Sequence, residues 1–234
     1  MEPLTHFFID QKIKNILDVG TGKGTFIPVL QNVFRNAEIT GIDPDKETLK
    51  AASEAFPGLV FKQMAAEKLQ FEDDTFDLAS ISMALHHLRK INRGLWEMKR
   101  VVKPGGWIIL NELISDNLNP AQEVHKLYHH FRSKIDRMTG ICHRETFTKD
   151  AIQQMLKVAD IPVQFFFENK QDSNLIIDKT ELASKVQKLE EALERIRDRE
   201  EYETMKPQIE EFREKAVKHG FQMATRLVIV GRVA

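Results

Sequence analysis

Between residues 15 and 113, short apolar runs alternate with longer stretches in which apolar residues recur at every third or fourth position. Short runs that stop at glycine or polar residues are typical of buried strands, and the longer spacing is typical of helices. The pattern predicts strands at residues 15–19, 38–42, 59–63, 76–81 and 107–111. It predicts helices that end near Arg35, run from Pro44 to about Ala55 with Asp43 as N-cap, and run from Arg89 to Val102. This alternation predicts a doubly wound α/β fold with a mostly parallel sheet, whose ligands bind beyond the carboxyl ends of the strands.

Two helical insertions interrupt the alternation after the fifth strand. The first, residues 115–146, contains a helix that begins at Asn119 and Pro120 and ends near Gly140. A helix at residues 149–159, opening at Thr148, and strands at 163–167 and 226–233 follow, and the second insertion, residues 179–219, separates those two strands. We therefore expect one domain, residues 1–234, with a seven-stranded sheet and two insertions.

The second insertion is predicted to be an antiparallel helical hairpin. Its apolar residues are spaced by four and three amid dense charge, with a break at Pro207: Leu182, Val186, Leu189, Leu193, Ile196, Ile209, Phe212 and Ala216. In one interpretation the charges are a solvated face and the apolar seam packs on itself or on the domain. In the other, the seam forms a homodimer contact or a lid over the site.

Composition narrows the possible partners and location. The 234 residues contain 34 Lys and Arg and 35 Asp and Glu, and a net charge of -1 disfavours a nucleic-acid substrate. The single cysteine, Cys142, allows no internal disulfide, and no run approaches the roughly 20 apolar residues that span a bilayer. The first residues lack the pattern of a secretory signal. We therefore expect a cytoplasmic protein that does not insert into membranes.

A glycine-rich turn follows the first predicted strand. Gly20, Gly22 and Gly24 lie between that strand and a helix, where missing side chains let the backbone approach a ligand. The dinucleotide fingerprint fails because Thr25 occupies its last glycine position, which disfavours a nicotinamide enzyme. Asp43, at the end of the second strand, is placed so that its two oxygens can accept both hydroxyls of a ribose.

These segments, taken in order, resemble the motifs of class I S-adenosylmethionine-dependent methyltransferases. The resemblance is carried by Leu17 to Gly24, Gly41 to Pro44, Phe76 to Leu78, Ala84 to Leu88 and Val102 to Gly106. It is strong from about Lys14 to Leu113, and it is greatest for the branch that includes ubiquinone and menaquinone C-methyltransferases. It implies a Rossmann-like sheet with an antiparallel last strand, S-adenosyl-L-methionine as cofactor, and methyl transfer to a small molecule.

The resemblance also implies a set of cofactor-binding residues. The methionine part would lie against Gly20, Thr21, Gly22 and Gly24, with Asp18 holding the loop and the amino group. Asp43 and Pro44 would lie at the ribose, Met83 near the sulfonium, and Ala65, Ala66 and Glu67 along the adenine. Two features depart from the family. Ala65 stands where an acidic residue often binds the adenine amino group, and the short N-terminus leaves the cover of the cofactor to another segment.

A base is required only if the acceptor must lose a proton, and histidine is the usual base at neutral pH. His86 and His87 follow the fourth strand on the expected side of the sheet. They are candidates for this role, and an equally good interpretation is that one packs on the next helix while the other is solvated.

The first insertion offers candidates for substrate binding. Its predicted helix has an apolar stripe made of Val124, Leu127, Tyr128, Phe131, Ile135 and Met138. Beside the stripe, His125, His129, Arg132 and Asp136 are spaced by four, three and four, and His130, His143 and Glu145 lie close in sequence. We hypothesise that this insertion covers the site, with Val124, His125, Tyr128, His129 and Arg132 near the substrate and His129 and His143 as catalytic candidates. Ordinary surface residues, with an Arg132 to Asp136 pair, are the alternative.

Other functions have weaker support in the sequence. Two histidines four residues apart can bind a metal, but no metalloprotease motif accompanies them, so we expect no metal site. The segment after the fourth strand lacks the motif of nucleobase amino-methyltransferases, and Cys142 lacks the preceding proline of carbon-5 enzymes. A cofactor-binding sensor or scaffold without turnover stays open as the alternative function, and an oxidoreductase is a remote third.

Overall fold

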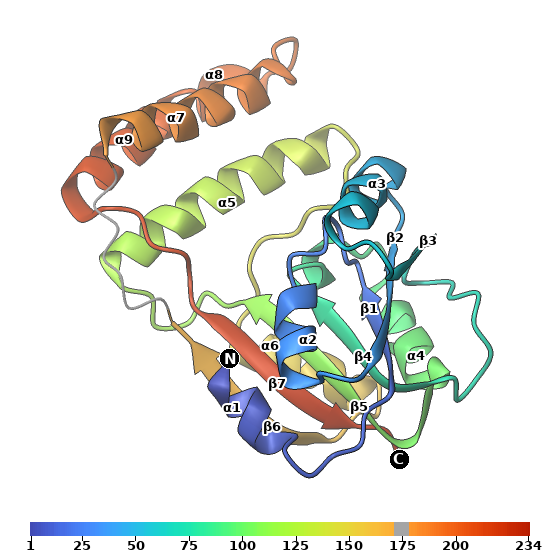
Figure 1. Ribbon diagram of the computed structural model, residues 1–234. Helices are drawn as coiled ribbons and strands as arrows, with labels where there is room; N and C mark the ends of the chain where they lie inside the picture. The colour runs from blue at the N-terminus through green and yellow to red at the C-terminus, as the bar shows by residue number, and fades with distance from the viewer. Residues whose placement is uncertain (171–177) are drawn as a thin grey trace. The chain divides into compact units, whose positions relative to one another are not determined.

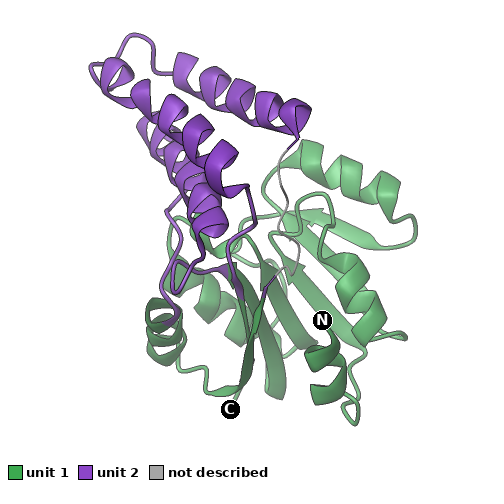
Figure 2. Cartoon of the chain, turned by 90° about the vertical axis from the view of Figure 1, so that its left-hand side faces the viewer, with its two compact units in different colours: residues 1–112, 150–169, 227–234 green, residues 113–149, 170–226 purple. Residues whose placement is uncertain are grey.

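The computed structural model describes residues 1–170 and 178–234, which form two compact units (Figures 1 and 2). Unit 1 comprises residues 1–112, 150–169 and 227–234, and unit 2 comprises residues 113–149 and 170–226. The two predicted insertions therefore meet in one compact body, although they are far apart in the sequence. The expectation of a single domain over residues 1–234 stays a prediction.

The sheet of unit 1 has seven strands in the order β3-β2-β1-β4-β5-β7-β6. They are β1 (Asn15–Val19), β2 (Glu38–Asp43), β3 (Val60–Gln63), β4 (Phe76–Ser82), β5 (Val102–Leu113), β6 (Val163–Asn169) and β7 (Arg226–Arg232). β1 to β5 pair in parallel. Near the start of β5 and the end of β7, Gly105 donates to the carbonyl of Val233 at 2.8 Å and Val233 donates to that of Gly106 at 2.9 Å. This reciprocal pairing is antiparallel. The predicted mostly parallel sheet with an antiparallel last strand is thus confirmed.

Helices α1 (Glu2–Phe7) and α2 (Ile27–Val33) pack on one face of the sheet. Their buried side chains meet those of alternate strand residues in a single cluster that includes Leu4, Leu30, Ile16, Leu78, Ile109 and Val230. The strand residues that alternate with these point to the opposite face of the sheet, because successive side chains of a strand lie on opposite faces. The remaining helices of the α/β alternation are α3 (Lys46–Ala55), α4 (Ile91–Val101) and α6 (Lys149–Val158), with a 3₁₀ turn η1 at Leu85–His87.

Helix α1 was not predicted. It has six residues, with proline in its first turn, so it shows little helical periodicity. Its stability comes from packing, because Phe8, just after the helix, makes edge-to-face contacts with the rings of Phe34 and Trp107. Sequence periodicity does not reveal a helix whose formation depends on such tertiary contacts.

Unit 2 is built from α5 (Pro120–Met138), α7 (Lys179–Glu194), α8 (Glu201–Met205) and α9 (Pro207–His219). Asn119 begins α5 with a capping box that includes Gln122. The seam of the hairpin packs against the predicted stripe of α5, with Val124, Phe131, Ile135, Leu189, Leu193 and Phe212 buried together. The interpretation that the seam packs within the chain is confirmed. The central side chains of the seam are buried within unit 2, and a homodimer contact or a lid formed by this insertion stays a prediction.

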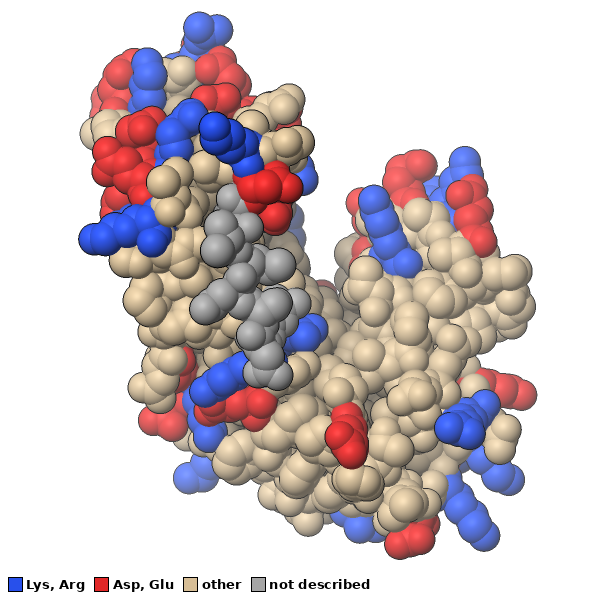
Figure 3. Space-filling model, turned by 60° about the vertical axis from the view of Figure 1, so that its left-hand side comes forward, with Lys and Arg blue, Asp and Glu red and all other residues tan. Residues whose placement is uncertain are grey.

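The outer surface of α7 to α9 carries interspersed acidic and basic side chains (Figure 3). Several pair along one helix, as Arg213 does with Glu210 and Lys215 with Glu211. Exposed pairs of this kind contribute only about 0.3 to 0.5 kcal/mol each, so they keep the face solvated more than they stabilise it. None of the described helices is both long and apolar enough to cross a bilayer.

Candidate functional site

The loops after β1, β2 and β4 emerge at one edge of the sheet. β1 lies between β2 and β4, with Val19 opposite Ile42 on one side and Ile81 on the other. The strand order reverses at this point, because the chain proceeds outward from β1 through β2 to β3 and then returns to β4. Such a switch point leaves a crevice beyond the strand ends, where doubly wound proteins bind ligands.

The glycine loop after β1 is a tight turn in the left-handed region. Gly20, Gly22 and Gly24 have φ values of 67°, 53° and 82°, which residues with a Cβ rarely adopt. A Cβ on Gly20 would lie 2.5 Å from that of Ala84, whereas a Cβ on Gly22 would meet nothing within 4 Å. Gly20 is therefore required for packing against the segment after β4, and Gly22 leaves open space at the edge of the sheet.

Asp43 binds the glycine loop. Its Oδ2 accepts a hydrogen bond from the backbone N–H of Gly22 at 3.0 Å, and its Oδ1 accepts one from that of Asp45 at 2.9 Å. Because each carboxylate oxygen has two acceptor positions, both remain able to accept a hydroxyl. Asp43 thus lies against the glycine loop, and its predicted contact with a ribose stays a prediction.

The prediction that Asp43 caps the next helix was wrong. β2 extends through Asp43, and the N-cap of α3 is Asp45, which accepts from the backbone N–H groups of Glu47 and Thr48. Pro44 therefore lies before the cap, where its carbonyl accepts from the side chain of Gln63. The shift leaves the carboxylate of Asp43 available to the loop instead of to the helix.

Asp18 is a buried carboxylate beneath the loop. It is 1% exposed, and its Oδ1 accepts from the hydroxyl of Ser80 at 2.7 Å. Burial raises the pKa of Asp18 to about 6, against the lowering influence of the Thr21 and Ser80 hydroxyls and with some repulsion from Asp43. Within the described residues, Asp18 Oδ2 and Thr21 Oγ1 are buried without a partner in hydrogen-bond geometry. Buried polar atoms of this kind are expected to be satisfied, so both fit a ligand that brings hydrogen-bonding groups to the loop.

The segment after β3 is partly committed to other contacts. Ala65 is exposed and Ala66 is buried. The carboxylate of Glu67 accepts from the backbone N–H of Lys90, the N-cap of α4, at 3.1 Å. Glu67 therefore stabilises the start of α4, and the adenine contacts predicted for these three residues stay predictions.

Met83 follows β4 in a left-handed conformation with a φ of 54°, and its N–H donates to the carbonyl of Asn111 at 2.8 Å. A non-glycine residue held in this region is uncommon and is enriched at functional sites. The conformation turns the chain sharply between β4 and η1. Met83 thus lies at the sheet edge where the sequence predicted it, and its proximity to a sulfonium stays a prediction.

The two candidate histidines after β4 have different environments. His86 is 4% exposed, and its Nδ1 lies 2.9 Å from Oε2 of Glu112, which is 1% exposed. His87 is exposed, with its ring stacked obliquely on that of His86 at 4.2 Å between centroids. His86 is thus buried and His87 exposed, and a hydrogen-bond partner of His86 is Glu112 of β5, which the sequence analysis did not identify. The suggested packing of one histidine on the next helix stays a prediction.

The substrate candidates of α5 face the core of unit 2. Tyr128 packs its ring near those of Phe212 and Phe221, and His125 accepts from the backbone N–H of Ala224 at 3.3 Å. Burial, followed by the nearby charges of Lys185 and His130, lowers the pKa of His125 to about 4, so this ring is neutral at pH 7. Arg132 is exposed and lies over the ring of Tyr128. A substrate role for these side chains stays a prediction.

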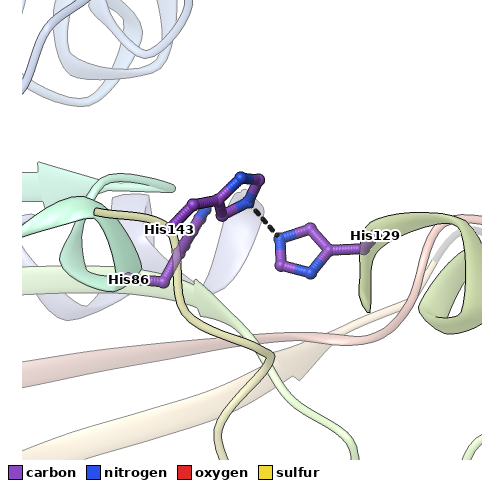
Figure 4. A group of neighbouring side chains, drawn as sticks. All are labelled: His86, His129 and His143. Carbon is purple, nitrogen blue, oxygen red and sulfur yellow. Dashed lines mark hydrogen bonds between the residues drawn. The ribbon is translucent and has the colours of Figure 1, made fainter. Parts of the chain in front are cut away.

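A hydrogen-bonded chain within unit 2 joins His129 and His143 (Figure 4). Their Nε2 atoms are 3.2 Å apart, and Nδ1 of His143 lies 2.6 Å from Oδ2 of Asp136. Oδ1 of Asp136 accepts from Arg195 at 2.6 Å, so the suggested pairing of Asp136 with Arg132 was wrong. Burial opposes ionisation of Asp136, but the bonds from His143 and Arg195 outweigh it and hold the pKa of Asp136 below its ordinary value.

His130 contacts residues near the end of the same insertion. His130 lies 3.6 Å from the carboxylate of Glu145 and 2.9 Å from the hydroxyl of Thr146. The functional roles of the histidines in unit 2, including those of His129 and His143 as catalytic candidates, stay predictions.

Comparisons with known proteins agree with this arrangement. Residues 17–110 match a family model described as a methyltransferase domain. A demethylmenaquinone methyltransferase of Chlorobaculum parvum is 31% identical over 135 residues, which are 58% of this chain and 55% of that protein. A ubiquinone/menaquinone biosynthesis C-methyltransferase of Geotalea daltonii is 32% identical over 145 residues, 57% of this chain and 60% of that protein. The aligned regions thus cover little more than half the length of these relatives.

Among solved structures, the fold matches a candidate methyltransferase of Bacillus halodurans. The TM-score is 0.65 at 17% sequence identity, and the alignment covers 99% of this chain and 97% of that one. At this identity the likeness establishes the fold.

Proposed function

We propose that the protein is a class I S-adenosylmethionine-dependent methyltransferase that transfers a methyl group to a small-molecule acceptor, because residues 17–110 match the model of a methyltransferase domain. The observation that carries the proposal is the hydrogen bond from Gly22 to Asp43, beside the unpartnered buried atoms of Asp18 and Thr21. Together they present acceptors of fixed geometry at the switch point of the sheet.

The chain's own residues fit S-adenosylmethionine group by group. The ammonium of its methionine part carries the donors that Asp18 Oδ2 lacks, and Asp43 retains acceptor positions for two ribose hydroxyls. The open space at Gly22 admits the ligand backbone. We assign Ala65, Ala66 and Glu67 to the adenine. Pro44 is assigned to the ribose together with Asp43, and Met83 to the surroundings of the sulfonium.

When bound, the cofactor supplies a methyl group that is already activated as a sulfonium. The protein therefore has to orient an acceptor in line with that methyl group and exclude water, which lowers the barrier by fixing the reactants in position. No covalent bond between protein and substrate is needed. The rigid strand ends and the left-handed turn at Met83 favour such fixed positioning.

The names of the relatives guide the choice of acceptor. Because two of them are described as quinone methyltransferases, reduced quinones are the first compounds to assay. The net charge of -1 supports a small molecule over a nucleic acid. We further propose a cytoplasmic location, and we propose that any homodimer formed through the helical insertions uses their polar outer faces, since the apolar seam is buried.

The test is isothermal titration calorimetry with S-adenosylmethionine and S-adenosylhomocysteine. We expect binding of both by the natural chain and a loss of about 10- to 100-fold in affinity for Asp43→Asn, since a hydrogen bond to a charged group contributes about 1.5 to 3 kcal/mol. The matched control is Glu38→Gln, which removes an exposed carboxylate at the opposite end of β2.

Absence of binding to either compound in the natural chain would refute the proposed function. Binding without formation of S-adenosylhomocysteine, across a panel of reduced quinones, phenols and amines, would instead favour the sensor or scaffold.

A further inference from the structure

A cavity lies at the edge of the sheet opposite the glycine loop. Its volume is about 810 Å³, and its walls are mainly residues of unit 1 that connect α1 to β1 and α2 to β2. Because β1 begins at Asn15 and the glycine loop follows Val19, the cavity and the loop are separated by the length of β1, roughly 16 Å. Pockets for small molecules measure about 300 to 1,000 Å³, so the size is that of a metabolite site.

Backbone hydrogen bonds hold the walls of the cavity in place. The N–H groups of Lys14 and Asn15 donate to Oδ2 of Asp77 at 2.8 and 2.9 Å, and Lys103 binds the other oxygen of that carboxylate at 2.6 Å. The N–H of Glu38 donates to the carbonyl of Lys14 at 2.7 Å, which joins the two connections. The backbone around the cavity therefore needs little ordering when a ligand binds, and this favours affinity.

Part of the cavity wall is apolar. The rings of Phe8 and Phe34 are buried and meet edge to face at 4.9 Å between centroids, and the half-buried Ile13 and Val33 pack against the same cluster. Ile9, which also lines the cavity, is 73% exposed. A ligand with an apolar body that covered Ile9 would gain the free energy of removing this surface from water.

The charged side chains of the cavity are mostly basic. Lys12, Lys14 and Arg35 line it together with one carboxylate, that of Glu38, which leaves a formal excess of two positive charges in a chain whose net charge is -1. Within residues 1–170 and 178–234, none of the three cations forms an ion pair. Several basic side chains of unit 1 outside the cavity do bind a carboxylate: Lys99, Arg100 and Lys103. Cations gathered without counter-ions in a concave site attract anions.

Side-chain amides complete the polar part of the lining, and they are Gln11, Asn15, Asn32 and Asn36. In the part of the chain that the structure describes, no hydrogen bond engages these amide groups. Each amide offers both donors and an acceptor, and the guanidinium of Arg35 can donate to two oxygens of a phosphate at once. A phosphate monoester, with a charge of about -1.5 to -2 at pH 7, balances the excess charge better than a carboxylate does.

We propose that this cavity is a second ligand site, separate from the cofactor edge, for an organic phosphate. Lys12, Lys14 and Arg35 bind the phosphate group, and the apolar wall at Phe8 and Phe34 contacts the body of the ligand. The same chemistry is offered by a free phosphorylated metabolite and by the headgroup of an anionic phospholipid. The experiments below distinguish these two sources.

The first experiment is a titration of the natural chain with 1-naphthyl phosphate, which joins a phosphate to an aromatic body, followed by amide nitrogen-15 NMR. We expect saturable binding that shifts the signals of residues 8–15 and 32–38 and leaves those of residues 20–24 unchanged. Inorganic phosphate and 1-naphthol, the two halves of the probe, should each bind more weakly. Saturable binding that shifts only amides outside the two connections would overturn the proposal.

The second experiment is sedimentation of the chain with vesicles of phosphatidylcholine, alone or mixed with phosphatidylglycerol. Binding of 1-naphthyl phosphate without binding to either kind of vesicle assigns the site to free organic phosphates. Binding to the mixed vesicles but not to those of phosphatidylcholine alone assigns it to a lipid headgroup. Failure to bind both the probe and the mixed vesicles would overturn the proposal.

Variants decide whether the cavity is responsible for the binding. Arg35→Gln should weaken it about 10-fold, because the variant loses charge-assisted hydrogen bonds to the phosphate. The matched control is Lys50→Gln, which removes an exposed cation of α3 outside the cavity and should bind as the natural chain does. Equal affinities of these two variants would indicate non-specific attraction and would overturn the proposal.

Calorimetry with S-adenosylmethionine tests whether the two sites are separate. Arg35→Gln should keep the affinity of the natural chain for this compound and the same unfolding midpoint, since Arg35 is exposed and lies at the opposite edge of the sheet. A parallel loss of affinity for S-adenosylmethionine in a folded Arg35→Gln variant would contradict a separate site.

Discussion

Asp18 provides a prediction in which stability and ligand binding move in opposite directions. Its carboxylate is 1% exposed, and its pKa is raised from 3.8 to about 6, chiefly by burial. This rise corresponds to roughly 3 kcal/mol, since each pKa unit is worth about 1.4 kcal/mol. The folded chain therefore bears a cost for ionising Asp18 at neutral pH that the unfolded chain does not.

The sign follows from proton linkage. Between pH 3.8 and about 6 the folded chain binds more protons at Asp18 than the unfolded chain does, so stability falls as the pH rises through this window. Asp18→Asn removes the charge while its side-chain oxygen can still accept from Ser80. We expect this variant to be more stable than the natural chain at pH 8, by about 1 to 3 kcal/mol after allowing about 1 kcal/mol for altered hydrogen bonds. The advantage should shrink as the pH falls towards 3.8.

Denaturant unfolding followed by tryptophan fluorescence measures this difference, because both tryptophans, Trp96 and Trp107, lie in unit 1 with Asp18. The matched control is Asp77→Asn. Burial of Asp77 is outweighed by hydrogen bonds from Lys103 and from the backbone of Asn15 and Lys14, which hold its pKa below the ordinary value. Removing that charge should destabilise the chain at pH 8, and the stability that Asp77 contributes is lost as the pH falls through its folded pKa.

The same Asp18→Asn variant should bind S-adenosylmethionine more weakly, because an amide replaces the carboxylate proposed to accept from the ammonium of the cofactor. A residue kept at the expense of stability is typical of a functional site. If Asp18→Asn is no more stable than the natural chain at pH 8, or if its advantage does not diminish at lower pH, the reasoning on this buried charge is wrong.

Two further predictions concern the glycine loop and the core of unit 2. Gly20→Ala should destabilise the chain by about 2 to 4 kcal/mol, since a Cβ at this position would overlap that of Ala84. Gly22→Ala should cost only about 1 kcal/mol in stability yet weaken cofactor binding. Denaturant unfolding measures the stability and calorimetry the binding, and equal destabilisation by the two variants would contradict the packing argument. Phe212→Ala should destabilise unit 2 by about 3 to 5 kcal/mol, because this ring is fully buried among α5, α7 and α9, and thermal unfolding followed by circular dichroism would contradict this if the midpoint were unchanged.

Much of the cofactor edge could be predicted because its signals are local. Glycines between a strand and a helix mark the loop, and an acidic residue at the end of the next strand marks its neighbour. The bond between Gly22 and Asp43 joins residues 21 apart, and it follows from topology, since adjacent parallel strands end at one edge. The sequence could not predict whether α3 begins after Asp43 or after Asp45. Both aspartates are good N-caps, and the hydrophobic periodicity does not resolve a shift of two residues.

Partners across long sequence separations were beyond prediction. Helical spacing suggested Arg132 for Asp136, but the structure brings Arg195, 59 residues away, to that carboxylate. The apolar seam predicted that α7 and α9 pack together, but nothing in its spacing indicates that α5 packs against both of them. An amphipathic helix specifies that one face must be buried, and the identity of the element that buries it depends on the whole fold.

Charged residues inside apolar strands were the strongest signal that the sequence analysis used only in part. Asp18 interrupts the apolar run of β1, and Glu112 that of β5, each near the carboxyl end of its strand. Burying a carboxylate is costly, so each such residue requires a donor from a neighbouring element. Both donors come from β4 or the turn after it, because β4 lies between β1 and β5: Ser80 serves Asp18, and His86 serves Glu112. One strand and its following turn thus contact both buried carboxylates. A sequence analysis that asked which strand could supply a partner for each buried charge would have pointed to the segment from Ser80 to His86.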